Sequence, residues 1–319
     1  MNTTRAKWLG VLAVFVLPLL DHNPYHIDVL VTAGIFILLA LGLNVMVGYA
    51  GVLNLGFAAF YAVGAYAFAL VNLRWGISFW PGLLISGTAA ALFGMLLVLP
   101  TLRLGGDYLA IVTLGAGEIV RIALNNLDEI TGGPNGLLGI KHPSFFGYDF
   151  SVESQPYYFL TAGLILITLF ALKRLEASRL GRAWIALRED ELAASCMGIS
   201  PAWTRLSAFG IGGFIAGMAG AVFAAKQGTI SPDSFDFVVS VMVLAMVVLG
   251  GVGNTYGVLL GGLCLSVLPE FLRGFDIYRM LLFGISMILI MLFRPQGLIG
   301  EARHRISTRA AAARLRKSK

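Results

Sequence analysis

GLNVMVGYAGVLNLGFAAFYAVG, residues 42–64, is the stretch that decides the fold class. It is apolar enough to lie in a membrane, yet it contains five glycines and the asparagines Asn44 and Asn54. Such a stretch is too polar and too rich in glycine for one smooth helix, so we predict a break between Gly48 and Leu55. Non-helical backbone at membrane depth is tolerated only where it is buried in protein or lines a cavity. The run GGVGN at 250–254 predicts a second break of the same kind.

The composition of the whole chain supports a membrane protein. Hydrophobic residues make up 58% of the 319 residues and charged residues 13%, whereas soluble domains carry about 25% charged residues. Spanning helices need about 20 apolar residues, fewer when irregular. The candidate spans are 8–20, 29–48, 56–73, 82–102, 107–126, 157–172, 204–225, 238–253, 256–272 and 277–293. The sequence therefore predicts an all-α integral membrane protein, a polytopic bundle of about ten segments with broken helices. Residues 1–319 show no convincing domain boundary and are treated as one transmembrane domain.

Positive charge predicts the orientation of this bundle. Basic residues precede the apolar run 8–20 as in a signal peptide, but no small-x-small cleavage site follows, so we expect an uncleaved first span. With the N-terminus inside, 17 lysines and arginines lie on the cytoplasmic side and six outside. That excess follows the positive-inside rule. It places both termini and the loop 173–203 in the cytoplasm, with the basic tail 301–319 near anionic lipid.

The motifs of catalysis are absent from the sequence. It contains no G-x-x-x-x-G-K-[ST], no H-E-x-x-H and no G-x-S-x-G. The two cysteines suggest no disulfide framework, and the four histidines lack metal-ligand spacing. The basic tail has no interleaved aromatic residues, which argues against nucleic acid as a partner. We expect no catalytic residue, no metal site and no cofactor bound by this chain.

Charge within the predicted spans is sparse. Glu118 and Arg121 are three residues apart and would share one helix face. An ionisable residue inside the membrane indicates function by default, and the alternative is a structural pair near the external end of its span. So few buried carboxylates disfavour an ion-coupled carrier.

One dense block of charge lies near the middle of the chain. Residues 173–191 hold nine of the 40 charged side chains, and GRAWIALREDELAASCMGIS occupies 181–200. With Ala183–Ala194 placed on one helix, Ala183, Leu187 and Ala194 fall near one face. That thin stripe favours shallow docking into a partner's groove, while an ordinary solvated loop fits the periodicity equally well. Gly198 would stop the helix.

This block resembles the cytoplasmic coupling loop of the branched-chain amino acid ABC transporter permeases, the M-type subunit. Four further motifs agree in order: GLNVMVGYAGVLNLGFAAFYAVGAY (42–66), TGGPNGL (131–137), GGVGNTYGVLLGG (250–262) and FRPQGLIG (293–300). The resemblance covers nearly the whole chain and implies the ABC importer permease fold.

The resemblance also implies partners and a location. The chain would pair with a homologous second permease subunit in the bacterial inner membrane, in contact with lipid. Two cytoplasmic ABC ATPases would hold ATP and magnesium, and a periplasmic binding protein would deliver leucine, isoleucine or valine. Related permeases for urea, short amides and other amino acids share the pattern, so the substrate stays open. An ion-coupled carrier and a non-transporting scaffold are the rival classes.

Residue roles follow from the same resemblance. The ATPase-coupling residues would be Gly181, Arg182, Ala183, Arg188, Glu189, Asp190, Glu191, Ala193, Ala194 and Gly198. Arg188 and the acidic residues 189–191 would supply polar rim contacts, although the family commonly has one or two acidic residues at this point rather than three.

Translocation-pathway candidates are the residues of the two predicted breaks and the charged pair. They are Asn44, Gly51, Asn54, Gly56, Glu118, Arg121, Gly250, Gly253 and Asn254. Helix packing and local capping by asparagine are the alternative for the breaks. Residues 132–136 would shape the external mouth, or form a plain turn.

Overall fold

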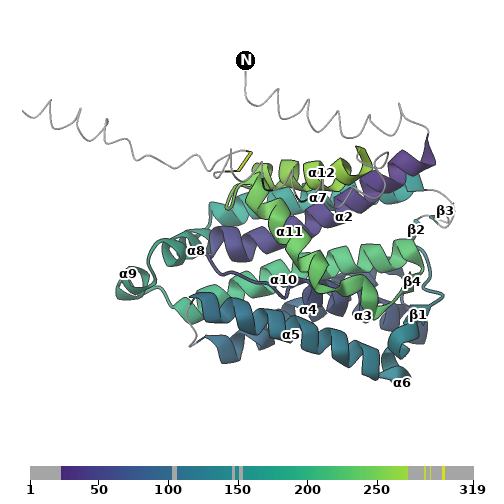
Figure 1. Ribbon diagram of the computed structural model, residues 1–319, viewed down its shortest axis with the longest axis horizontal. Coiled ribbons are helices and arrows are strands. Elements are labelled where there is room, and N and C mark those ends of the chain that lie inside the picture. The colour runs from purple at the N-terminus through teal and green to yellow at the C-terminus, as the bar shows by residue number, and fades with distance from the viewer. Residues whose placement is uncertain are drawn as a thin grey trace, which may run out of the picture.

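The computed structural model describes residues 23–102, 106–145, 148–150 and 154–271, together with 284, 288, 297 and 298. Long helices run roughly along one axis of the molecule (Figure 1). The long helices are α2 (Pro24–Asn44), α3 (Phe57–Trp75), α4 (Phe79–Thr101), α5 (Gly106–Asn126), α7 (Ser154–Glu176), α10 (Pro201–Gln227), α11 (Phe237–Gly250) and α12 (Thr255–Phe271). The shorter helices are the π-helix η1 (Val45–Tyr49), α6 (Asp128–Thr131), the 3-10 helices η2 (Gly133–Asn135) and η3 (Pro232–Phe235), α8 (Arg179–Glu189) and α9 (Glu191–Cys196).

The predicted spans agree with these helices wherever the structure describes them. Seven helices in the described part of the chain are long and apolar enough to cross a membrane, and α12 is a shorter apolar helix. Each candidate span from 29–48 to 256–272 coincides with one long helix. The candidates 8–20 and 277–293 lie outside the described residues. The prediction of an all-α polytopic bundle is confirmed.

Both predicted helix breaks are present. After η1 the chain leaves the helix at Gly51, whose φ of 69° favours glycine, and α3 begins at Phe57. The side chain of Asn54 accepts a hydrogen bond from the Gly56 amide at 2.9 Å, just before α3. The second break lies between α11 and α12, where Gly251 has φ 112°. There Asn254 accepts hydrogen bonds from the two backbone amides at positions 256 and 257, both at 3.1 Å. Asn254 therefore caps α12, whereas Asn54 bonds the amide of Gly56, the residue that precedes α3.

Helix α10 is the centre of the bundle. It packs most extensively against α4 and α3, and then against α2. Glycines allow these backbones to approach closely. A Cβ added to Gly212 would lie 2.6 Å from the Gly42 carbonyl oxygen on α2. A Cβ on Gly217 would overlap the Ser86 carbonyl oxygen on α4, and one on Gly64 would overlap Gly217 itself.

Replacing Gly217 by valine is therefore expected to destabilise the bundle strongly. Backbone atoms on both sides leave the added side chain no room, so we expect a loss of about 3 kcal/mol or more. Gly163→Val on α7 is the matched control, since a Cβ there meets nothing within 4 Å. Thermal melting of the detergent-solubilised chain measures both. Equal melting temperatures for the two variants would contradict the close packing of α10.

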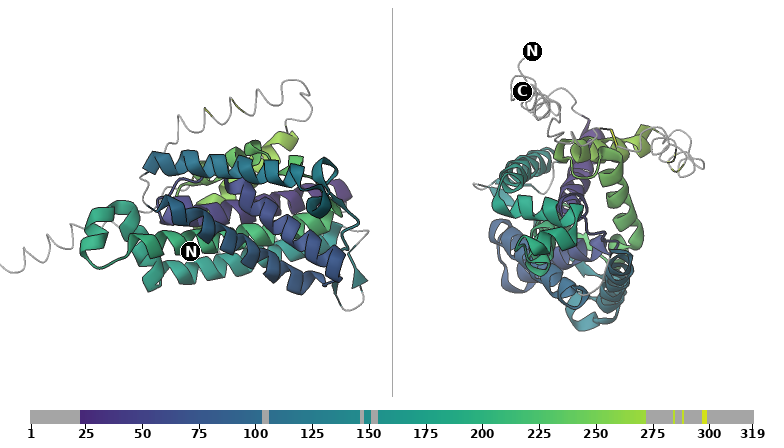
Figure 2. Two further views of the ribbon diagram at one scale, coloured as in Figure 1. Left: turned by 90° about the horizontal axis from the view of Figure 1, so that it is seen from below. Right: turned by 90° about the vertical axis from the view of Figure 1, so that its left-hand side faces the viewer.

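The two ends of the bundle carry different structures. Helices α8 and α9 project from one end, and α6 and the strands gather at the other (Figures 1 and 2). Strand β1 (Leu137–Leu138) pairs antiparallel with β4 (Thr229–Ile230), with Leu137 opposite Ile230. Strand β2 (Ser144–Phe145) pairs antiparallel with β3 (Tyr148–Asp149). The turn expected at 132–136 lies here, where Gly132 ends α6 and η2 follows.

Candidate functional site

The charged block folds as two short helices, so the prediction of one helix over Ala183–Ala194 is wrong. Ser178 caps α8, its side chain accepting a hydrogen bond from the Gly181 amide at 3.3 Å. Asp190 then takes an extended conformation, with φ −160° and ψ 114°, and ends α8. Its carboxylate accepts a hydrogen bond from the Ala193 amide at 2.9 Å, which starts α9. A helix N-cap is a better environment for this short acidic side chain than a helix interior.

Burial within α8 differs from the predicted stripe of small residues. Gly181, Trp184 and Leu187 are the buried positions of α8, and Trp184 is 0% exposed. The Trp184 indole donates hydrogen bonds to the Thr204 carbonyl oxygen at 3.1 Å and to Ser207 Oγ at 3.0 Å, both on α10. The face of α8 with Gly181, Trp184 and Leu187 therefore packs on the bundle, and Leu187 of the predicted stripe is not free for a partner. The spacing of three between Gly181, Trp184 and Leu187 is the signal that would have identified this face.

Arg188 turns inward, where we expected a contact at the rim. Its Nη1 donates a hydrogen bond to the Gly48 carbonyl oxygen in η1. Its aliphatic stem lies over Gly51, where an added Cβ would be 2.6 Å from Arg188 Cγ. The missing side chain at Gly51 makes room for the arginine, and this is the physical reason for the difference.

The three acidic residues of the block also have separate positions. Glu191 Oε2 lies 2.6 Å from Nη2 of Arg205, whose side chain is 9% exposed. Arg205 Nη1 also donates to the Leu102 carbonyl oxygen at 3.1 Å. Asp190 caps α9, while the Glu189 side chain remains 72% exposed. All three residues are exposed, but Asp190 is used as a helix cap and Glu191 as the ion-pair partner of Arg205 within the chain.

Replacing Glu191 by alanine is expected to lower the stability of the chain by about 1 kcal/mol. The substitution leaves the buried Arg205 guanidinium without its carboxylate, but the 47% exposure of Glu191 limits the effect through solvent screening. Glu189→Ala is the control, because that carboxylate is exposed and lies 3.9 Å from Arg188. Thermal melting measures the two variants. A fall in melting temperature for Glu189→Ala as large as that for Glu191→Ala would contradict the ion-pair assignment.

Large apolar side chains are exposed on and beside α9. Leu192 is 78% exposed, Met197 83% and Trp203 73%. In contrast, Ala194 on the same helix is buried. Ala193 is exposed between them, and Gly198 follows α9 just before the chain enters α10. These large residues were not predicted to be a docking surface, because the predicted docking face consisted mainly of the small residues of the block.

The break residues predicted to line a pathway are brought together. Asn44 Oδ1 accepts a hydrogen bond from the Gly253 amide at 3.0 Å, which joins the two breaks. Asn44 and Asn54 are each 0% exposed. Asn54 Nδ2 contacts Met46 Sδ at 3.3 Å. Asn44 therefore connects the two breaks, and Asn54 is bonded within the first break, beside the start of α3.

Glu118 and Arg121 form the ion pair that their spacing predicts. Arg121 Nε lies 3.0 Å from Glu118 Oε2, and the two side chains are 33% and 35% exposed. They stand on α5, the least buried of the seven span-length helices in the described part of the chain. A charged pair that is partly uncovered on such a helix needs protein or water beside it.

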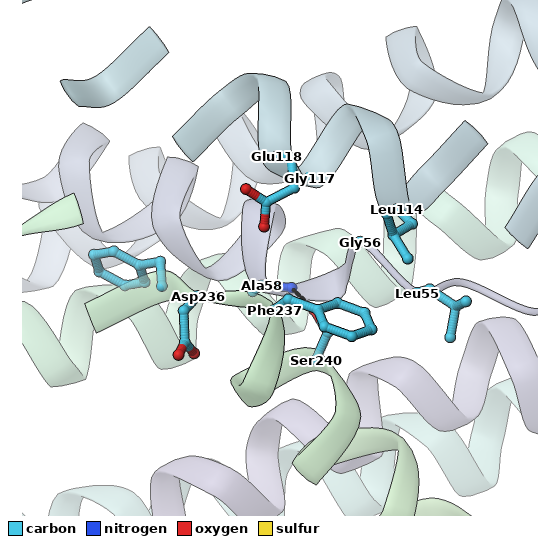
Figure 3. A pocket seen from close by; sticks show the side chains of 10 residues that line it. Leu55, Gly56, Ala58, Leu114, Gly117, Glu118, Asp236, Phe237 and Ser240 are labelled. Carbon is cyan, nitrogen blue, oxygen red and sulfur yellow. Dashed lines mark hydrogen bonds between the residues drawn. The ribbon is translucent and has the colours of Figure 1, made fainter. Parts of the chain in front are cut away.

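A small hollow lies beside Glu118, between α5, the start of α3 and α11 (Figure 3). Gly56 and Gly117 meet at its wall, since a Cβ on Gly117 would be 3.0 Å from Gly56 Cα. On its other side Ser240 Oγ accepts a hydrogen bond from the Ala58 amide at 2.8 Å. The volume is about 10 Å³, enough for one water. A hollow of this volume is too small for an amino acid.

Comparison with known proteins assigns the chain to a family. The model of the branched-chain amino acid transport system permease component matches residues 25–291. The chain belongs to this family of membrane permeases. It is 46% identical to the high-affinity branched-chain amino acid transport system permease protein LivM of Escherichia coli K12, over 90% of this chain and 73% of that protein.

More distant relatives are also named as branched-chain amino acid transport permeases. The probable branched-chain amino acid transport permease protein LivM of Methanocaldococcus jannaschii is 29% identical, over 86% of this chain and 92% of its own. The permease protein LivH of Escherichia coli K12 is 24% identical, over 83% and 91%. No solved structure matches the chain. Together with the seven span-length helices, family membership makes this chain a multi-pass membrane permease.

Proposed function

We propose that the chain is a permease subunit of an ATP-driven ABC importer and forms part of the pathway for leucine, isoleucine and valine. The identity to LivM over 90% of the chain is the observation that carries this proposal. The five motifs that resemble the family extend from residue 42 to residue 300 and include both helix breaks. A periplasmic binding protein would deliver the amino acid.

The projecting end of the bundle is the proposed docking site for one of the two ABC ATPases. Leu192 on α9 and Met197 just after it present exposed apolar surface, and Glu189 supplies charge beside them. Apolar anchors with a polar rim are the usual arrangement of a specific protein interface. ATP and Mg²⁺ would be held by the ATPases, and this chain would contribute no catalytic residue. The other coupling residues, including Arg182 and Ala183, would support this surface from α8.

The exposed side of α5 is the proposed contact with a homologous second permease. Ile111 and Ile119 on α5 are 66% and 68% exposed. The chain matches both LivM and LivH of one organism, which supports a pair of related permeases. Glu118 and Arg121 would then face a pathway between the two subunits, and opposite charges suit the ammonium and carboxylate of an amino acid.

The excess of basic residues supports an orientation in the bacterial inner membrane. We propose that α8 and α9 lie in the cytoplasm, that the strands lie on the periplasmic side, and that both termini are cytoplasmic. The 17 lysines and arginines counted on the cytoplasmic side, against six outside, support this orientation. Lipid would cover the remaining apolar faces of the bundle.

Gentle extraction of tagged chain from its own host tests the proposal. We expect a second permease and two P-loop ATPases to co-purify, identified by mass spectrometry. A tagged, unrelated multi-pass protein from the same host is the control for non-specific capture. Recovery of the chain alone in several mild detergents would contradict the proposal and favour an ion-coupled carrier.

A further inference from the structure

One cluster of residues connects α8 to both helix breaks. We call it the junction, and it consists of Trp184 and Arg188 on α8, Gly48 and Tyr49 on η1, and Thr255 at the start of α12. Its members come from three places far apart in the sequence. Tyr49 and Thr255, for example, are separated by 206 positions.

Arg188 holds the π-helix at the Gly48 carbonyl group. Its guanidinium donates to the Gly48 oxygen, and a charged donor makes a stronger hydrogen bond than a neutral one. Its stem fills the space beside Gly51, where the chain leaves the helix. Single π-helical turns are frequent at functional sites. The position of Arg188 is therefore coupled to the geometry of the first break.

Trp184 and Tyr49 form the second connection. Their rings are stacked, with centroids 6.3 Å apart and an angle of 6° between planes. The indole is also hydrogen-bonded to α10 at Thr204 and Ser207. A rotation of α8 against α10 must therefore displace Tyr49 or break this stack.

The two breaks are joined to each other beyond Tyr49. The Tyr49 hydroxyl and Thr255 Oγ1 share a hydrogen bond, and Asn44 accepts a hydrogen bond from the Gly253 amide. The backbones approach so closely that a Cβ on Gly48 would lie 2.7 Å from the Gly253 nitrogen. Neither break has room to move far without the other.

We propose that the junction transmits movement of α8 to both breaks together, with Arg188 as its main positioning residue. When an ATPase shifts α8, the Gly48 carbonyl and the Tyr49 ring follow it, and Thr255 carries the displacement to α12. The two breaks then change conformation as one unit, which opens or closes the hollow beside α3 and α11. This inference rests on the proposed function, since it assumes that an ATPase moves α8.

The test measures amino acid transported per ATP hydrolysed in the complete complex. It uses proteoliposomes that contain this chain, the second permease and both ATPases, with the binding protein supplied. Arg188→Gln is expected to lower the ratio at least tenfold while the ATPases stay bound and keep hydrolysing ATP. Arg188→Lys should lower it less, by about threefold, because the ammonium retains one donor for the Gly48 oxygen. Arg179→Gln, at an exposed position at the start of α8, is the matched control and should stay within twofold of the wild type.

A double-mutant cycle tests the connection between the breaks. Tyr49→Phe and Thr255→Val each remove one hydroxyl of the shared hydrogen bond. Each is expected to lower the transport ratio about threefold, and the double variant should lower it no further, because both break the same link.

Three results would overturn the inference. They are an Arg188→Gln ratio within twofold of the wild type, loss of the ATPases from that variant, or independent effects of the two hydroxyl deletions. Loss of the ATPases would show that Arg188 anchors the partner and does not transmit movement. A wild-type complex that moves no amino acid with ATP would instead overturn the proposed function, and the junction with it.

Discussion

Replacing both Leu192 and Met197 by glutamate is expected to reduce ATP-driven uptake at least a hundredfold. Their exposed side chains would be buried against an ATPase groove, and such anchors contribute about 2 kcal/mol or more each to binding. Two lost anchors correspond to roughly a thousandfold weaker binding. Neither residue is part of the buried core, so the bundle should still fold. Uptake in proteoliposomes and recovery of ATPases with the tagged chain measure the effect.

Leu138→Glu provides the control for recovery of the ATPases. Leu138 is 66% exposed on β1, at the opposite end of the bundle. The added charge there should leave ATPase binding unchanged. Wild-type recovery of ATPases with the Leu192→Glu, Met197→Glu variant would show that α9 is not the docking surface.

Replacing Glu118 by glutamine is expected to lower uptake more than tenfold. The Arg121 guanidinium would then remain on α5 without its carboxylate partner. An unpaired charge within a membrane segment is costly. In the proposed pathway the variant also loses the group that would receive the amino acid's ammonium. Uptake assays combined with thermal melting measure the two effects.

The double variant Glu118→Gln, Arg121→Gln separates a pathway role from a structural one. Removing both members of an ion pair is often nearly neutral for stability. We therefore expect a melting temperature near that of the wild type, with uptake still reduced more than tenfold. Wild-type uptake in the double variant would show that the pair is structural alone.

Local signals made the breaks and the long helices predictable. The run from Gly48 to Leu55 and the run from Gly250 to Asn254 contain glycine and asparagine, whose backbone and capping preferences act within a few residues. Hydropathy located the long helices in the described part of the chain, because a helix that crosses the bilayer needs a long run of apolar residues.

The site depended more on contacts that no local pattern encodes. The break at Asp190 has a local cause, a carboxylate that caps α9, but the regular spacing of alanines concealed it. The inward turn of Arg188 depends on Gly48, 140 positions away, and the burial of Trp184 depends on Tyr49 and α10. Exposure of Leu192 likewise follows from how α9 projects from the bundle. Such tertiary placement overrides the periodicity from which the docking face was predicted.

ATP-dependent uptake of labelled leucine tests the central claim most directly. The assay uses proteoliposomes that hold this chain with the second permease and ATPases, with the binding protein outside and Mg²⁺ and ATP inside. We expect uptake that requires ATP and is competed by isoleucine and valine but not by urea. Leucine uptake by this chain alone, driven by an ion gradient without ATP, would contradict the account.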